Sequence, residues 1–293
     1  MNRALILDGG LATHLEALGV SLDSPLWSGV ALLEQPDLVR RGHADFARAG
    51  ADILCTATYQ CSAASLTAHG LAAASQRVLF ARSVELVREA WSDADRSGKT
   101  ALSIGPYGAT LADGSEYRGD YGLGVDDLLA FHRATLELAT GTETDLIMVE
   151  TVPDAAEVRA WASLAAELDH PVWLSLSVRP DGVHLADGTE LAKLDELLGD
   201  SAVAAVGVNC CAPSTATRAL EKISAFGLPV YVYPNSGETY EERAWQGQPE
   251  EPTDHVEDWR RFEPIAIGGC CRTSPEQIEE LRRRVEQWAP SPG

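Results

Sequence analysis

Two pairs of adjacent cysteines are the residues of this chain best suited to chemistry. Cys210 and Cys211 follow one short apolar run, and Cys270 and Cys271 follow another. Zinc binds cysteine thiolates in tetrahedral geometry, and a catalytic zinc site keeps one of its four positions open. Three of these thiolates with an exchangeable fourth ligand would form such a site. Inert burial is the alternative, since free cysteine is among the most buried residue types.

The arrangement of the cysteines narrows the kind of site. A closed structural zinc with all four paired cysteines is disfavoured, because adjacent side chains on a strand point to opposite faces. Adjacent pairs are also unlike the disulfide framework of a secreted protein, so metal binding or catalysis is the better expectation. Of the two remaining cysteines, Cys55 is expected in the core, and Cys61 is expected there more than at the edge of a pocket.

Two acids end otherwise apolar runs, Asp8 near the N-terminus and Glu150 in the middle of the chain. A carboxylate in such a place is costly unless it is paired or faces a polar ligand. Together the two could hold an α-amino group, and an ion pair with arginine is the alternative for each. His14 is interpreted as a helix residue more than as a ligand. Arg272 could neutralise thiolate charge or cap a loop, and the sequence does not separate these roles.

Eight short runs of mainly apolar, β-branched residues predict the strands that position these groups. Their near-continuous apolar character is typical of strands buried on both faces. The predicted strands are Ala4–Gly10, Asp52–Tyr59, Ala101–Tyr107, Asp145–Thr151, Val172–Val178, Val203–Cys210, Val230–Asn235 and Pro264–Cys271. Polar and special residues gather at the carboxyl ends of these strands, which is where the active sites of parallel barrels lie.

Helical patterns alternate with the strands. They are predicted over Gln35–Gly50, Ala63–Ala90 and Val125–Ala139, from Pro153 onward, and over Ser214–Phe226 and Thr273–Trp288. Eight such units without a break in composition predict an α/β fold, a single (β/α)8 TIM-type barrel domain over residues 1–293. A doubly wound sheet is the alternative, but no Gly-x-Gly-x-x-Gly follows a strand. Two long loops, Gly108–Gly124 and Gly237–Asp258, are expected on the catalytic face.

The amino-acid composition of the chain limits the classes of partner that we expect it to bind. The formal net charge of −21 disfavours nucleic acid, whose phosphates such a surface repels. The apolar stretch at the N-terminus is too short for a signal peptide, and no apolar run reaches the roughly 18 residues of a membrane span. We therefore expect a cytoplasmic protein that binds small molecules and not membranes. The outer helix faces show no extra apolar stripe, so no oligomeric state is predicted.

Several motifs together resemble the homocysteine S-methyltransferase family. They cover essentially the whole chain in the family's order, and their combination is specific. They are Asp8-Gly9-Gly10, Pro25-Leu26-Trp27-Ser28, Thr56-Ala57-Thr58-Tyr59-Gln60, Ser103-Ile104-Gly105-Pro106-Tyr107-Gly108, Gly207-Val208-Asn209-Cys210 and Gly268-Gly269-Cys270-Cys271-Arg272. The stretches Leu111–Tyr121 and Tyr233–Glu238 resemble the bacterial and plant branch, which uses S-methylmethionine.

The resemblance implies roles for individual residues. One zinc ion per chain would be held by Cys210, Cys270 and Cys271, which leaves Cys211 as the odd one out. Asp8 and Glu150 would hold the homocysteine amino group. The remaining residues implied in substrate binding are Gly9, Thr56, Tyr59, Trp27 and Asn235, with Tyr59 and Trp27 on the donor side. No additional cobalamin or folate module is present, so the chain resembles the single-domain type.

The implied reaction transfers a methyl group from S-methylmethionine, or from S-adenosylmethionine, to the zinc-bound homocysteine thiolate, giving methionine. A free thiol with a pKa of about 8.5 is mostly protonated at neutral pH, and zinc removes that proton. Aromatic faces could hold the sulfonium donor by cation–π attraction. Selenohomocysteine or selenocysteine as acceptor is a close variant. The more distant alternatives are a barrel hydrolase or aldolase that uses Glu150 and Asp8, and a thiol redox sensor.

Overall fold

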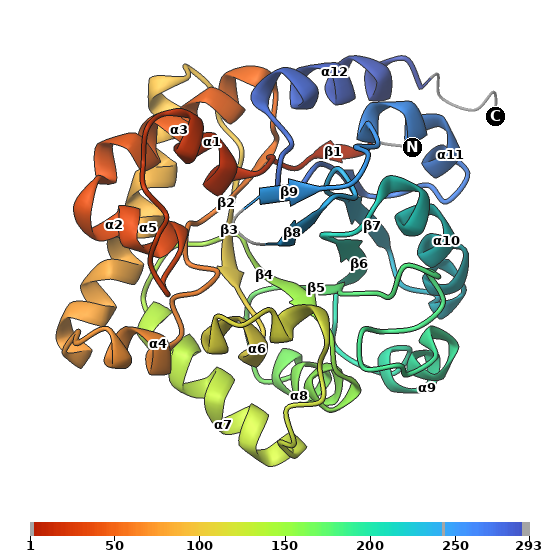
Figure 1. The fold of residues 1–293 in the computed structure, drawn as a ribbon, viewed down its shortest axis with the longest axis horizontal. Helices are drawn as coiled ribbons and strands as arrows, with labels where there is room; N and C mark the ends of the chain where they lie inside the picture. Colours follow the sequence, from red (N-terminus) through yellow and green to blue (C-terminus); the bar gives the residue numbers. More distant parts are fainter. Residues whose placement is uncertain (1–2, 242–243, 289–293) are drawn as a thin grey trace.

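The eight predicted strands form one parallel sheet that closes into a barrel, as the computed structural model of the chain shows (Figure 1). The structure describes residues 3–241 and 244–288. The strands of the barrel are β1 (Leu5–Ile6), β2 (Ile53–Cys55), β3 (Lys99–Ile104), β4 (Leu146–Val152), β5 (Val172–Leu176), β6 (Ala205–Asn209), β7 (Val230–Tyr233) and β10 (Ala266–Ile267). The order in the sheet is β1-β10-β7-β6-β5-β4-β3-β2, and a bridge between Leu7 and Ile53 joins its two ends. The predicted (β/α)8 barrel is confirmed.

Helices surround the barrel, between the strands in sequence (Figure 1). They are α1 (Leu11–Ala17), α2 (Ser28–Glu34), α3 (Pro36–Ala49), α4 (Ala63–Ala68), α5 (Ala73–Asp93), α6 (Tyr107–Leu111), α7 (Val125–Leu136), α8 (Ala155–Ala165), α9 (Asp195–Leu198), α10 (Pro213–Ile223), α11 (Val256–Arg260) and α12 (Pro275–Glu286). Within the described residues, no helix has both the length and the apolar character needed to cross a membrane.

Two apolar clusters hold the fold together. The smaller one fills the barrel and draws residues from all eight strands or their immediate ends, among them Met148, Trp173 and Tyr231. The rings of Trp173 and Tyr231 lie 5.1 Å apart within it. The larger cluster lies between the strands and the helices. Because each strand contributes side chains to both clusters, its two faces are buried, which explains the near-continuous apolar runs of the sequence.

Local sequence features set the ends of the helices. In α3, Pro36 occupies the first turn, and Gly50 ends the helix with φ +107°. The single helix predicted over Ala63–Ala90 is wrong, because the chain forms α4 and α5 instead. Gly70, with φ +89°, lies between the two helices in a left-handed conformation that α-helix does not allow.

The two segments predicted as long loops contain secondary structure. Gly108–Gly124 includes most of α6 and a 3-10 helix, η1 (Ser115–Tyr117). Gly237–Asp258 includes the antiparallel hairpin of β8 (Thr239–Glu241) and β9 (Ala244–Gln246). Both follow strands, so they stand on the carboxyl-terminal side of the barrel.

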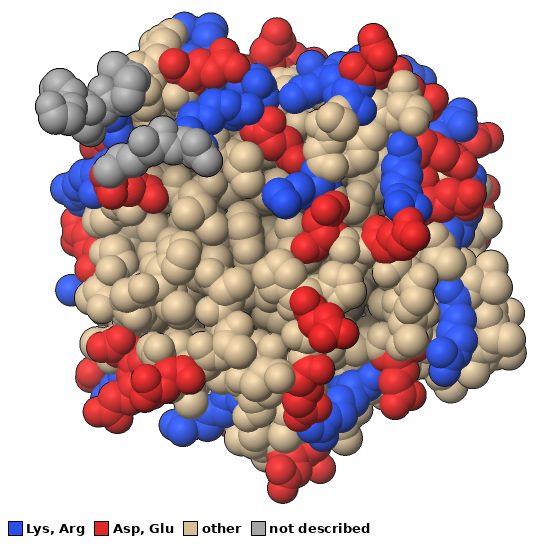
Figure 2. Space-filling view, turned by 180° about the vertical axis from the view of Figure 1, so that it is seen from behind, with Lys and Arg blue, Asp and Glu red and all other residues tan. Residues whose placement is uncertain are grey.

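On the face opposite to that of Figure 1, basic and acidic side chains lie interspersed (Figure 2).

Candidate metal centre and active site

Three sulfur atoms meet at the carboxyl-terminal end of the barrel. The Sγ atoms of Cys210, Cys270 and Cys271 all lie within 4.8 Å of one another. Cys210 directly follows β6 and the other two follow β10, and β7 lies between these strands. Sulfurs at about 2.3 Å from one tetrahedral zinc would be about 3.8 Å apart. The trio therefore fits a metal of this kind with only a small contraction.

The backbone around the sulfurs is constrained in two ways. Cys210 and Arg272, which are not glycines, adopt φ of +48° and +68°, and such strain is concentrated at functional sites. Neither Gly268 nor Gly269 has a positive φ, so the need for glycine there is not one of backbone conformation. A Cβ atom on Gly269 would lie 2.2 Å from Thr273 Oγ1, so close packing requires a glycine there.

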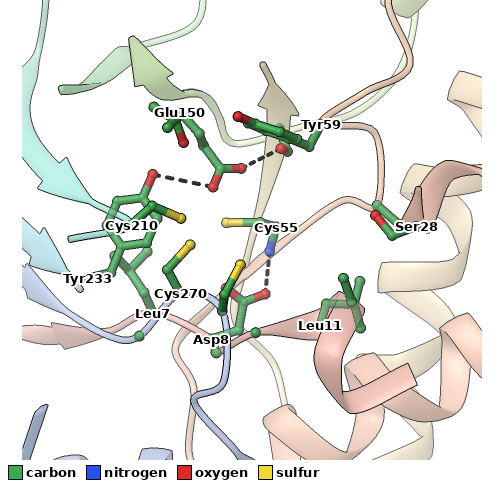
Figure 3. Close-up of a pocket in the computed structure, with 18 of the residues that line it drawn as sticks. Leu7, Asp8, Leu11, Ser28, Cys55, Tyr59, Glu150, Cys210, Tyr233 and Cys270 are labelled. Atoms are coloured by element: carbon green, nitrogen blue, oxygen red, sulfur yellow. Dashed lines mark hydrogen bonds between the residues drawn. The ribbon is translucent and has the colours of Figure 1, made fainter. Parts of the chain in front are cut away.

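The other three cysteines have distinct surroundings. Cys211 is buried in the larger core cluster, where burial raises the pKa of its thiol to about 12. Cys61 also belongs to that cluster, as expected. Cys55 packs against the core cluster inside the barrel, as expected, and it also lines the pocket beside the three sulfurs. Figure 3 shows its sulfur pointing toward those of Cys210 and Cys270. The short strand β2 ends at Cys55, which brings its side chain to the floor of the pocket.

Asp8 and Glu150 lie in the same pocket as the sulfurs (Figure 3). Asp8 Oδ2 accepts a hydrogen bond of 2.8 Å from the backbone N–H of Cys55. Glu150 accepts a short hydrogen bond from Ser103 Oγ and a longer one, 3.3 Å, from the hydroxyl of Tyr233. Ser103 and Tyr233 stand on β3 and β7, so two strands orient the Glu150 carboxylate.

The surroundings of the two carboxylates raise their pKa values. Among the described residues, no arginine, lysine or histidine pairs with Asp8 or Glu150. Burial, together with the charge of Glu150, raises the pKa of Asp8 to about 8, against the effect of its hydrogen bond from Cys55. Burial likewise raises the pKa of Glu150 to about 7. A cation placed between them would restore the charged forms, which suits a ligand ammonium group.

Most of the residues that the resemblance implicates in substrate binding line this pocket. Gly9, Thr56, Tyr59 and Trp27 are all among its walls. The rings of Trp27 and Tyr59 meet edge to face at 6.4 Å, and Trp27 has a φ of +46°. The buried hydroxyl of Thr56 accepts a hydrogen bond of 3.0 Å from the backbone N–H of Ser103. The pocket thus brings acids, sulfurs and aromatic rings together in one cavity.

Asn235 does not line the pocket. Its backbone N–H donates to the carbonyl of Cys211 at 3.1 Å, and its side chain accepts from the N–H of Gly237 at 2.8 Å. These bonds shape the turn after β7. Arg272 forms an ion pair of 3.3 Å with Glu238. His14 lies in α1 and contacts Asp45 at 3.0 Å, away from the sulfurs.

Several residues that line the pocket had no role predicted from the sequence, among them Ser103, Tyr233 and Tyr117. Ser103 and Tyr233 stood inside quoted motifs, and each is polar within a buried apolar run. A buried hydroxyl needs a hydrogen-bond partner, and that requirement was the available signal. The contribution of Tyr117 depends on how the segment after β3 folds back over the barrel, which no local pattern indicates.

Several known proteins are similar to this chain over nearly its whole length. A model of the homocysteine S-methyltransferase family matches residues 5–285. The homocysteine S-methyltransferase of Escherichia coli (strain K12) is 42% identical over 294 residues, covering 96% of this chain and 94% of the relative. Homocysteine S-methyltransferase YbgG of Bacillus subtilis (strain 168) is 38% identical over 303 residues, covering 98% and 95%. The crystal structure of the metallated form of the homocysteine methyltransferase MmuM from Escherichia coli has a TM-score of 0.86, with 40% identity, covering 97% of this chain and 96% of that one. The similarity extends from the first strand into the last helix.

Proposed function

Since the chain belongs to the homocysteine S-methyltransferase family and is a methyltransferase of that kind, we propose that Cys210, Cys270 and Cys271 hold one zinc ion at which homocysteine is methylated. The observation that carries this proposal is the convergence of the three sulfurs within 4.8 Å in a pocket that also contains Asp8 and Glu150, for which the described part of the chain supplies no cation. Family membership decides against the hydrolase, aldolase and thiol-sensor alternatives.

The thiols themselves indicate why a metal is needed. The hydrogen bond with Cys210 raises the pKa of the Cys270 thiol, burial raises it further, and the bond with Cys271 does not offset the rise. Without a metal the cysteines are therefore neutral thiols at physiological pH. Zinc supplies the positive charge that keeps thiols ionised near neutral pH.

We assign the acceptor side of the pocket to Asp8 and Glu150. Their carboxylates would bind the ammonium group of homocysteine and so direct its thiol toward Cys210 and Cys270. Thr56 and Gly9 line the same part of the pocket and would border the bound amino acid. Such positioning is effective, since correct orientation of two reactants can supply about 7–11 kcal/mol of the barrier.

The donor side is assigned to the aromatic rings of Trp27 and Tyr59. A sulfonium donor carries a positive charge that an aromatic face attracts by about 0.5–2 kcal/mol. The charge disappears when the methyl group leaves, so the departing thioether needs no acid catalyst. We propose S-methylmethionine as the donor, with S-adenosylmethionine as a possible second one, and selenium analogues of homocysteine as further acceptors. Asn235 contributes, on this proposal, through the turn after β7.

Residues 1–293 would act as one homocysteine-binding barrel domain that works on small molecules and needs neither nucleic acid nor a membrane surface. A cytoplasmic setting is proposed because all six cysteines are free thiols, a state that the cytosol maintains.

The adjacent cysteines of the sixth strand provide a matched test. Protein with Cys210→Ser should contain less than one zinc per chain and form methionine at a small fraction of the normal rate. Cys211→Ser should retain both zinc and activity, since Cys211 is buried in the core and outside the pocket. Equal zinc content and equal activity in the two variants would refute the assignment.

A second experiment addresses the donor and the metal together. Methionine formation is measured with each sulfonium donor separately, before and after treatment with a strong chelator and again after zinc is returned. We expect the chelated protein to be inactive, zinc to restore activity, and S-methylmethionine to be used faster. Full activity after removal of all metal would rule out the zinc proposal, and a faster reaction with S-adenosylmethionine would reverse the choice of donor.

A further inference from the structure

The side chain of Asn209 connects the two halves of the site. It is buried at the end of β6, next to Cys210. No role was predicted for it from the sequence beyond its place in the motif Gly207-Val208-Asn209-Cys210. Its Oδ1 accepts hydrogen bonds from the backbone N–H of Thr151 at 2.9 Å and from Ser175 Oγ at 2.7 Å. Its Nδ2 donates to Thr151 Oγ1 at 2.8 Å and to Cys270 Sγ at 3.9 Å. A carboxamide has two donors and two accepting positions, and Asn209 uses all four.

The orientation of this carboxamide is determined by its neighbours. The backbone N–H of Thr151 can only donate, so the oxygen of Asn209 must face it. The two N–H groups are then directed at Thr151 Oγ1 and at the sulfur of Cys270. A sulfur that faces an N–H donor is stabilised as a thiolate, because charge-assisted hydrogen bonds are stronger than neutral ones.

Two strained residues flank this connection. Thr151 follows Glu150 and has a φ of +61°, and Cys210 follows Asn209 and has a φ of +48°. β4 and β6 are separated by β5, from which Ser175 reaches the same carboxamide. The left-handed conformations persist only if the surroundings hold them, and the bonds of Asn209 to Thr151 are such a restraint. The position of Glu150 is therefore tied to the position of Cys270.

We propose that Asn209 is a positioning residue that couples the metal ligand Cys270 to the Thr151–Glu150 segment, which binds the acceptor's amino group. This inference rests on the proposed function, since it assumes zinc at the three sulfurs. One N–H of Asn209 orients and stabilises the Cys270 thiolate. The other N–H and the oxygen hold Thr151, and through it the Glu150 carboxylate, at the distance that homocysteine must span.

Cobalt(II) provides a direct probe of the bond to sulfur. When cobalt alone is added to metal-free protein, thiolate ligands produce charge-transfer bands in the near ultraviolet. A thiolate that loses a hydrogen bond gives up electrons more easily, so its band moves to lower energy. Asn209→Asp and Asn209→Ala differ in charge and volume, but both lack the N–H donors. We expect both to shift the bands to lower energy and to lower zinc affinity by about 10- to 100-fold, the range found for partners of metal ligands.

Two further variants test individual hydrogen bonds of the Asn209 carboxamide. Thr151→Val removes the hydroxyl that accepts from Nδ2 but leaves the bond to Cys270, so the cobalt bands should stay in place while the KM for homocysteine rises. Ser175→Ala removes a bond to the same oxygen and should leave the bands unchanged. Thermal unfolding establishes that each variant is folded. If both Asn209 variants fail to fold, the Thr151→Val result decides.

The outcomes distinguish this inference from the proposed function. Wild-type protein without thiolate-to-cobalt bands would overturn the metal site and the coupling with it. Normal wild-type bands that stay unchanged in folded Asn209 variants would overturn the coupling alone. So would a normal KM for homocysteine in Thr151→Val, or a band shift of equal size in Ser175→Ala, because a general loosening of the pocket would then account for the data.

Discussion

Asp52 and Asp8 lie on neighbouring strands of the barrel but at opposite ends of it. Asp52 precedes β2, and its backbone N–H donates to Ile6 in β1; Asp8 follows β1, and its N–H donates to Ile53 in β2. Asp52 is bound by both terminal nitrogens of Arg3 at 2.9 Å and by Arg282 at 3.2 Å. Among the described residues Asp8 has no such cation.

The electrostatics of the two aspartates differ accordingly. Burial raises the pKa of Asp52, but its hydrogen bonds from Arg3, Ile6 and Arg282 outweigh that effect and lower the pKa below its ordinary value. Burial raises the pKa of Asp8 to about 8. An acid that has its own cation contributes to stability, whereas an acid buried without one is suited to a cationic ligand. The contrast follows the division of (β/α)8 barrels into a stabilising and a catalytic end.

The largest effect is expected from removing one of the proposed metal ligands at the catalytic end. Cys270→Ser should lower the rate of methionine formation by more than about 100-fold, since even loss of a partner of a ligand costs about 10- to 100-fold. Stability in urea should change little, because the sulfur faces the pocket. Activity is measured with saturating zinc. A rate near that of the wild-type protein would contradict the assignment of catalysis to the end of the barrel that contains Asp8 and Cys270.

Glu150→Gln should have the next largest effect. The substitution keeps the shape of the side chain but removes the charge that would attract the homocysteine ammonium, a charged hydrogen bond worth about 1.5–3 kcal/mol. The KM for homocysteine should therefore rise by about 10- to 100-fold, and the free energy of unfolding should be unchanged or higher. Steady-state kinetics and urea titration give the two quantities. An unchanged KM together with lower stability would make Glu150 a structural residue.

Asp52→Asn tests the opposite end. Loss of its charge weakens the bonds that Arg3 and Arg282 make to it, although Arg282 keeps Glu286 as a partner. The free energy of unfolding should fall by about 1–3 kcal/mol. The KM for homocysteine should stay the same, because Asp52 lies at the other end of the strands from the pocket. Urea unfolding and kinetics on the same preparation check both statements. A raised KM without a loss of stability would contradict the claim that Asp52 serves stability and not substrate binding.

The pH dependence of stability should be the smallest effect. The folded protein holds a proton on Asp8 up to about pH 8, whereas the unfolded chain releases it near the ordinary aspartate pKa of 3.8. Stability from this group is therefore complete below that value and is lost as the pH rises to about 8. Asp52 has the opposite sign, because its lowered pKa gives stability that is lost as the pH falls below 3.8.

Unfolding in urea at about pH 5 and about pH 8, without homocysteine, measures this slope. Asp8→Asn should lose less stability than the wild-type protein between the two conditions. A steeper loss in the variant would mean that Asp8 is charged in the folded protein and has a cationic partner after all.

The sequence predicts the barrel well because its strands are buried on both faces, so each run such as Leu146–Val149 is apolar throughout. The convergence of Cys210 with Cys270 follows from the strand ends alone. The break between α4 and α5 was missed, since alanine-rich sequence hides a turn at Gly70. The inward position of Cys55 and the bonds of Asn209 depend on side-chain direction across strands, which periodicity does not encode.

The most direct test of the metal centre is X-ray absorption at the zinc edge, on protein loaded with zinc and measured with and without homocysteine. The account predicts one zinc per chain with three sulfur neighbours, from Cys210, Cys270 and Cys271, and a further sulfur neighbour when homocysteine is added. The account would be contradicted by a zinc ion with four protein sulfurs whose neighbours do not change when homocysteine is added. It would also be contradicted by a protein that binds no zinc.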